Sequence, residues 1–175
     1  RRRPGVWVVH HRVAGGRPSS VWRLRGAVAA CHGMGKHSRA AADLVLARTS
    51  AVFGKPDGDW QKSFINARIG PRARGETLVS LAPSLVRELI GDNPDAGGSA
   101  LARDCMAAVP EATYRATMLD RMGFDLRHAL KQFAAPTLVL AGSRDNNAPA
   151  PMMAKMATDI PSERYDEHEG VGHIG

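Results

Sequence analysis

The sequence has only two cysteines and no long apolar run. Cys31 and Cys105 lie far apart in a chain of 175 residues, so they imply no disulfide framework. The apolar runs are far too short to cross a bilayer, and the arginines that open the chain precede only the short stretch 6–9, which is not a signal peptide. These absences exclude a disulfide-stapled secreted domain and a membrane protein. We therefore expect a soluble, cytoplasmic protein with no membrane partner.

Acidic residues are almost missing from the beginning of the chain. Residues 1–48 hold nine arginines and one lysine against the single acid Asp43, whereas the whole chain has a net charge of +7. The basic character therefore belongs to a leading segment, which we place at residues 1–43. Three interpretations are open for it: remnant strands of a sheet at 6–9 and 27–31, a basic arm for an anionic surface, or sequence never selected to fold, such as a frameshift or truncation product. The last is favoured, and nucleic acid is an unfavoured partner because no recognition motif accompanies the charge.

Two strands and a helix are predicted near the end of the chain. Residues 137–140 form a continuous apolar and β-branched run between a proline and a glycine, which is typical of a strand buried on both faces of a parallel sheet. Residues 149–160 have apolar positions at helical spacing and a proline in the first turn. Residues 163–168 are more polar, which favours a strand near the sheet edge.

Asp145 and His173 follow these two strands. A right-handed crossover makes the strands parallel and puts their carboxyl ends on one side of the sheet, so we expect the two side chains to leave the same edge. Simpler interpretations remain open, because an aspartate after a strand is often only a turn former and a histidine near a chain end is often only solvated.

The order of these features resembles the last third of the α/β-hydrolase family. The resemblance rests on Pro-Thr-Leu-Val-Leu-Ala-Gly followed by Ser-Arg-Asp, a helix, Ile-Pro, a short strand and Gly-Val-Gly-His. In that family the acid and then the histidine of a Ser/His/Asp triad occur in this chain order. The resemblance implies that Asp145 holds the imidazole of His173 in the correct tautomer and that His173 acts as general base and acid, with no cofactor.

The middle of the chain resembles the same family. Residues 43–50 look like the strand after the nucleophile helix, and residues 59–132 look like a helical cap with its main part at about 59–122. Glycines and prolines divide this region into expected helices at 59–69, 76–90, 98–109, 111–121 and 125–133. The layout is most similar to ester and lactone hydrolases of the 3-oxoadipate enol-lactonase type, which implies a small ester or lactone as substrate. The expected fold class is thus α/β: over residues 44–175, a partial α/β-hydrolase fold in which a small, mostly parallel sheet carries an inserted cap.

Several side chains of the expected cap are candidates for substrate binding. A cap excludes water and shapes the acyl pocket. The apolar candidates are Trp60, Phe64, Met118 and Met122, with Leu85 and Met106 as further possibilities. The candidates for an anionic substrate group are Arg68, Arg72, Arg74 and Arg87. For each residue alone, a core position or a solvated face is more common than a substrate contact.

The nucleophile motif of the family is missing. An active member needs Gly-x-Ser-x-Gly on a sharp strand-to-helix turn, and the sequence contains no such motif. The nearest candidate is Ala29–Gly35, which is either an elbow with Gly33 in place of the serine or a Gly-rich loop in which Gly33 and Met34 offer oxyanion N–H groups. Only residues 36–43 separate it from the next strand, which is too short for a parallel crossover with a helix.

Two chemical roles for the leading segment are disfavoured. Cys31 precedes the glycines and does not lie between them, so it is a poor substitute nucleophile. The histidines there have no spacing typical of a closed metal site, and we predict no metal. We therefore predict a truncated, weakly active or inactive hydrolase, with self-association through an exposed sheet edge. The alternative is a non-catalytic protein that binds an anionic surface through residues 1–43.

Overall fold

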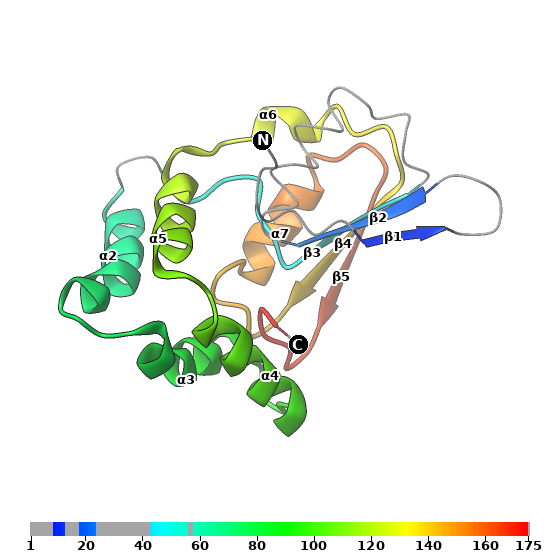
Figure 1. Ribbon diagram of the computed structural model, residues 1–175. Helices are drawn as coiled ribbons and strands as arrows, with labels where there is room; N and C mark the ends of the chain where they lie inside the picture. The colour runs from blue at the N-terminus through cyan, green and yellow to red at the C-terminus, as the bar shows by residue number, and fades with distance from the viewer. Residues whose placement is uncertain (1–8, 13–17, 24–42, 56–57, 175) are drawn as a thin grey trace.

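The computed structural model describes residues 9–12, 18–23, 43–55 and 58–174 (Figure 1). In these residues a five-stranded sheet has the order β1-β2-β3-β4-β5. Its strands are β1 (Val9–Arg12), β2 (Pro18–Arg23), β3 (Leu44–Ala47), β4 (Thr137–Gly142) and β5 (Glu163–His168). The first pair is antiparallel and the other three pairs are parallel, so the predicted fold class, an α/β fold with a small and mostly parallel sheet, is confirmed.

The two C-terminal strands occupy the predicted positions. Strand β4 pairs in parallel with β3 on one side and β5 on the other, and its alternate residues Thr137, Val139 and Ala141 are buried. Strand β5 lies at one edge of the described sheet and has mostly exposed, charged side chains. This distribution follows from pairing, because a strand between two others buries far more of its surface than an edge strand.

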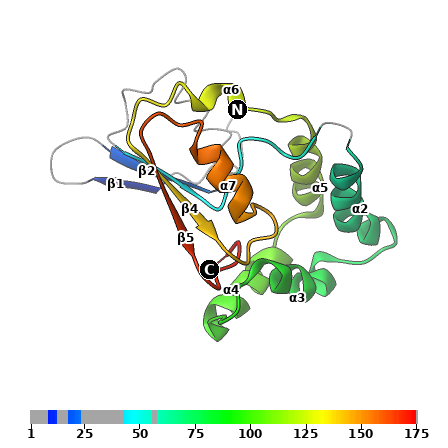
Figure 2. The same cartoon turned by 180° about the vertical axis from the view of Figure 1, so that it is seen from behind.

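The connection from β3 to β4 contains four longer helices, which precede the short elements η1 (Arg121–Gly123) and α6 (Arg127–Leu130). The four are α2 (Asp59–Ala73), α3 (Leu78–Leu89), α4 (Ala96–Ala107) and α5 (Glu111–Asp120). We call them the helical insert. Figures 1 and 2 show that α2 and α5 lie away from the sheet, whereas α3 and α4 lie near the carboxyl ends of β4 and β5.

Helix α2 continues beyond its predicted end. The Gly70–Pro71 pair predicts an end at residue 69, yet the helix runs to Ala73. Pro71 stands in the last turn, where it removes one intrahelical N–H donor and only two further helical residues follow it. Gly75 directly follows the C-cap Arg74; its φ of +89° suits a left-handed C-terminal glycine, and its N–H donates to the carbonyl of Arg72.

The predicted connecting helix at 125–133 is mostly absent. The chain forms a 3-10 turn, η1 (Arg121–Gly123), and then only one helical turn, α6 (Arg127–Leu130). Between them the Leu126 N–H donates to the Ala51 carbonyl, and Asp125 forms a β-bridge with Val52. This long-range pairing holds the backbone extended, and sequence periodicity contains no sign of it.

The described residues contain two apolar clusters. One lies between the sheet and helix α7 (Ala150–Ala157), with Leu46, Phe133, Val139 and Met153 fully buried. The other lies within the helical insert and contains Ile65, Leu78, Tyr114 and Met118. The insert thus has an apolar core of its own, formed by apolar stripes of its helices, as amphipathic periodicity requires.

None of the helices in the described part of the chain is long and apolar enough to span a membrane.

Arg48 has a strained backbone directly after β3. Its φ of +48° is left-handed, which costs an L-residue about 1–2 kcal/mol and glycine almost nothing. Arg48→Ala and Arg48→Gly lose the same side chain, but only glycine relieves the strain. We expect the Arg48→Gly variant to be about 1 kcal/mol more stable than Arg48→Ala in urea unfolding. An alanine variant of equal or greater stability would show that residue 48 is not left-handed in solution.

Candidate active site

Asp145 lies three residues beyond the end of β4. Its N–H donates to the carbonyl of Gly142 at 3.1 Å, which closes a turn at the carboxyl edge of the sheet. The N–H groups of Asn147 and Ala148 then donate to Oδ1 of Asp145 at 2.8 and 2.9 Å. The side chain has no exposed surface. Oδ1 of Asp145 is thus held in place by the backbone that leads into α7.

His173 lies on a loop that follows β5 and packs against the end of β4. The Arg144 N–H donates to the Val171 carbonyl at 3.0 Å, and the Gly170 N–H donates to Ser143 Oγ at 2.9 Å. A Cβ added to Gly142 would overlap the Val171 carbonyl group, so only glycine allows this approach. The segments after the two strands therefore lie side by side.

The structure brings Asp145 and His173 into direct contact. Nδ1 of His173 lies 2.8 Å from Oδ2 of Asp145. An ionised carboxylate can only accept, so Nδ1 carries a proton, and in the neutral imidazole Nε2 then has the lone pair. The imidazole keeps 12% of its surface exposed, whereas the carboxylate is covered. This arrangement can orient an imidazole and leave its far nitrogen able to take a proton from a reactant.

The environment favours the ionised form of Asp145. Burial by itself raises the pKa of this carboxyl, but the hydrogen bond and charge of His173 and the N–H donors of Ala148 and Asn147 outweigh it and lower the pKa below its ordinary value of 3.8. Three donors thus compensate for the loss of water around the charge.

The predicted apolar pocket residues pack together in the helical insert. Trp60 and Phe64 form an aromatic cluster with Phe53, with ring centroids 5.2–5.5 Å apart. Met118 is buried in the insert's core, and Met122 packs against that core. Trp60 is 53% exposed. Phe64, Met118 and Met122 thus have the contacts of core residues, whereas Trp60 is half exposed. Binding of substrate by these four residues remains a prediction.

Three of the four predicted arginines pair with carboxylates. Arg68 contacts Glu88 at 3.2 Å and lies over the ring of Phe64, Arg72 forms a two-pronged pair with Glu111, and Arg74 contacts Glu76 at 3.4 Å. Arg87 is exposed on α3. An anionic substrate would therefore compete with an internal carboxylate for the first three.

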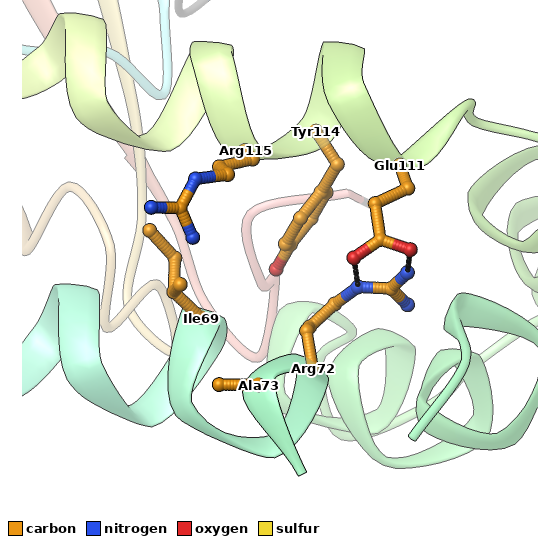
Figure 3. A pocket seen from close by; sticks show the side chains of 6 residues that line it. All are labelled: Ile69, Arg72, Ala73, Glu111, Tyr114 and Arg115. Carbon is orange, nitrogen blue, oxygen red and sulfur yellow. Dashed lines mark hydrogen bonds and ion pairs between the residues drawn. The ribbon is translucent and has the colours of Figure 1, made fainter. Parts of the chain in front are cut away.

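A small pocket lies between α2 and α5 (Figure 3). Its volume is about 70 Å³, and its lining consists of Ile69, Arg72, Ala73, Glu111, Tyr114 and Arg115. Burial raises the pKa of Tyr114, although the nearby Arg68, Arg121 and Arg72 act to lower it. The pocket has room for a few water molecules and is far below the size of a substrate site.

The remaining candidates lie outside the described residues. These are Gly33 and Met34 of the predicted oxyanion loop, the disfavoured nucleophile Cys31, and most of the strands expected at 6–9 and 27–31. In the part of the chain that the structure does describe, no three histidine, cysteine or acidic side chains could hold a metal ion.

The residues that support the pair are not evident from sequence patterns. Gly142 and Ser143 indicate only the end of a strand, yet both contact the loop that carries His173. The signal that could have found them is the pair of glycines, Gly170 and Gly172, just before the histidine, since glycines allow close approach of two backbones.

The lowered pKa of Asp145 predicts a pH-dependent contribution to stability. Because the pKa is lower in the folded than in the unfolded chain, the ionised carboxylate stabilises the fold above about pH 4, and this stabilisation is lost as the pH falls through the lowered pKa. We expect Asp145→Asn to lower the free energy of unfolding by about 1–3 kcal/mol at pH 7 and by less as the pH falls below 4. Urea unfolding from pH 7 to pH 3 measures this.

The matched control for that experiment is Asp104→Asn, an exposed position on α4. It should change stability little at any pH. A constant difference between Asp145→Asn and the unmodified chain over the whole range would contradict the lowered pKa.

Comparison with known proteins gives structural matches only. No family model and no curated protein matches the sequence. Among solved structures, a thermophilic esterase from Thermogutta terrifontis superposes with a TM-score of 0.74 at 23% identity over 91% of this chain and 58% of that chain. The enol-lactonase from Burkholderia xenovorans LB400 gives a TM-score of 0.73 at 21% identity over 90% of this chain and 59% of that chain. A bromoperoxidase from Bacillus anthracis gives a TM-score of 0.76 at 14% identity over 89% of this chain and 60% of that chain.

The chain thus spans about three fifths of the length of these structures. Identities this low indicate a common fold. The sheet, the inserted helices and the matches together show that this chain has part of the α/β-hydrolase fold.

Proposed function

We propose that the chain provides the acid and the histidine of a site that hydrolyses a small carboxylic ester or lactone. The observation that carries the proposal is the 2.8 Å contact between His173 Nδ1 and the buried carboxylate of Asp145. An imidazole held in this way has one nitrogen committed to the acid and the other available for proton transfer. Two of the structures similar to this chain are an esterase and an enol-lactonase, which supports the substrate class.

The proposed chemistry moves one proton through His173. Nε2 takes the proton from the attacking hydroxyl group as that oxygen bonds to the carbonyl carbon. The resulting imidazolium is stabilised by Asp145, and the tetrahedral intermediate then expels the alkoxide, which receives the proton from Nε2. Asp145 keeps its charge throughout.

No side chain of this sequence is recognisable as the attacking nucleophile. The sequence has no Gly-x-Ser-x-Gly motif, so water is the only attacking group we can assign. Loss of the nucleophile lowers the rate of a Ser/His/Asp site by several orders of magnitude. We therefore propose a weakly active form, in which binding and general-base catalysis by His173 supply the residual rate.

The helical insert is proposed as the cap of this site. It connects β3 to β4, and its helices α3 and α4 lie near the carboxyl ends of β4 and β5, where Asp145 and His173 also lie (Figures 1 and 2). In this proposal the acyl pocket is formed on the insert by Trp60, Phe64, Met118 and Met122. A cap that covers the site lowers the local dielectric and would strengthen the contact between the acid and the histidine.

Hydrolysis of p-nitrophenyl acetate tests the proposal. General-base catalysis contributes about 10²–10⁴-fold, so we expect slow release of p-nitrophenolate that is nevertheless measurable above the buffer rate. This excess should disappear in His173→Ala. Release is followed by absorbance at pH 7–8.

The matched control is His168→Ala, which removes an exposed histidine at the end of β5. It should keep the excess rate. Equal rates for the unmodified chain and His173→Ala would contradict a catalytic role for the pair, and rapid turnover lost in His173→Ala would show that the chain contains a nucleophile after all.

The basic segment suggests a second function. Residues 1–48 hold ten basic side chains and one acid, which is enough charge for salt-sensitive binding to an anionic polymer. We expect only weak retention on heparin, lost at moderate salt. Strong retention that disappears on deletion of residues 1–40 would favour the binding protein over the hydrolase.

Self-association through a sheet edge stays a prediction. The β5 edge has the exposed charged side chains Glu163, Arg164 and Glu167, and charges of this kind oppose pairing with a second strand.

A further inference from the structure

The loop that carries His173 is held from two sides. One side is the end of β4, through Ser143 and Arg144. The other is the connection between α3 and α4, which belongs to the helical insert. There the Ile174 N–H donates to the Leu89 carbonyl at 3.0 Å, and the Asp92 N–H donates to the Gly170 carbonyl at 2.8 Å. These two bonds enclose the histidine, one before it in the chain and one directly after it.

Two glycines make this second contact possible. A Cβ added to Gly91 would overlap the Gly170 carbonyl oxygen and would lie 2.7 Å from the Gly172 nitrogen. A Cβ added to Gly172 would lie 2.5 Å from the Ile90 carbonyl carbon and 2.7 Å from the Gly91 nitrogen. All of these neighbours are backbone atoms, which cannot move aside as a flexible side chain can. The two backbones therefore touch directly, with no side chain between them.

Asp92 also contacts the residue that precedes Asp145. Its carboxylate pairs with Nε of Arg144 at 2.9 Å, and Arg144 directly precedes Asp145. The same short turn of the insert is thus bonded to the residue before the acid and to the loop that carries the histidine. This turn of the insert therefore connects the segment of Asp145 with the loop of His173 from outside the sheet.

We propose that Gly91 and Asp92 are positioning residues for His173, so that the helical insert and not the sheet alone sets the contact between the imidazole and Asp145. The proposal rests on the proposed function in one respect, since it assumes that this contact is the one that matters for catalysis. Any ligand or substitution that shifts the junction of α3 and α4 then moves the imidazole of His173, whose Nε2 is the proposed proton acceptor. By linkage, breaking the contact between His173 and Asp145 loosens that junction in return.

The test follows the imidazole directly by NMR of chain labelled with ¹⁵N-histidine. The signal of His173 is identified by its absence in His173→Ala. We expect the Nδ1 proton of His173 to be protected and shifted downfield in the unmodified chain, and to be lost in Gly91→Ala under conditions where that variant is folded. The loss follows because the added methyl group displaces the loop and breaks the bond to Asp145.

Gly75→Ala is the matched control for destabilisation. Gly75 lies in the same insert and has a φ of +89°, so alanine is strained there, but no atom lies within 4 Å of the added Cβ. This variant should lose stability and keep the Nδ1 proton signal. If neither variant loses the signal, the contact does not depend on Gly91. If both lose it, the loss follows from destabilisation of the insert and not from the contact at Gly91. Either outcome contradicts the proposal.

Asp92→Asn provides a milder variant in case Gly91→Ala does not fold. It keeps the backbone bond to Gly170 and weakens only the pair with Arg144, so we expect faster exchange of the Nδ1 proton and no loss of fold. Asp125→Asn is its control, because it weakens the Asp125–Arg127 pair, another exposed ion pair of the chain. Equal exchange rates in the two variants would contradict a role for Asp92.

Failure of this proposal is distinguishable from failure of the proposed function. A chain that shows the protected Nδ1 proton but hydrolyses no ester lacks the proposed activity and still allows the positioning test. A chain that hydrolyses ester through His173 and keeps the Nδ1 signal in Gly91→Ala has the activity without the positioning.

Discussion

The site depends on one buried charge, the carboxylate of Asp145. A carboxylate without exposed surface is costly unless donors replace the water that its oxygens have lost. Two backbone N–H groups, from Asn147 and Ala148, serve Oδ1, and the imidazole of His173 serves Oδ2. The histidine is therefore needed by the fold as well as by the proposed chemistry.

The helical insert is tied to this pair through backbone contacts. Glycines at positions 91 and 172 let the connection between α3 and α4 touch the loop of the histidine directly. Backbone contacts of this kind transmit displacement well, because no side-chain rotation can absorb it. The remainder of the insert, with its own apolar cluster around Tyr114, is more independent of the sheet. A change in the insert is thus expected to reach the site mainly through the short turn from Leu89 to Asp92.

The fold was predictable where local signals were strong. The buried run 137–140 and the polar run 163–168 became β4 and β5, and the acid and the histidine at their ends came together. Predictions from glycine and proline alone were less reliable. Pro71 lies within the last turn of α2 and does not end it, and residues 124–125 are extended because they pair with 52–53.

The sequence by itself determined the strands β3, β4 and β5, most of the helices and the chain order of acid and histidine, because apolar periodicity and turn residues are local properties; β1 and β2 do not lie where the strands at 6–9 and 27–31 were expected. Only the tertiary structure decided how the pair is held: the glycine contacts among Gly91, Gly142 and Gly172 and their partners, the bond from Gly170 to Ser143, and the ion pair of Asp92 with Arg144. These contacts join positions tens of residues apart along the chain. Those of Gly91 and Asp92 depend on how the helical insert packs against the loop of the histidine, and no pattern within a short window of sequence encodes that packing.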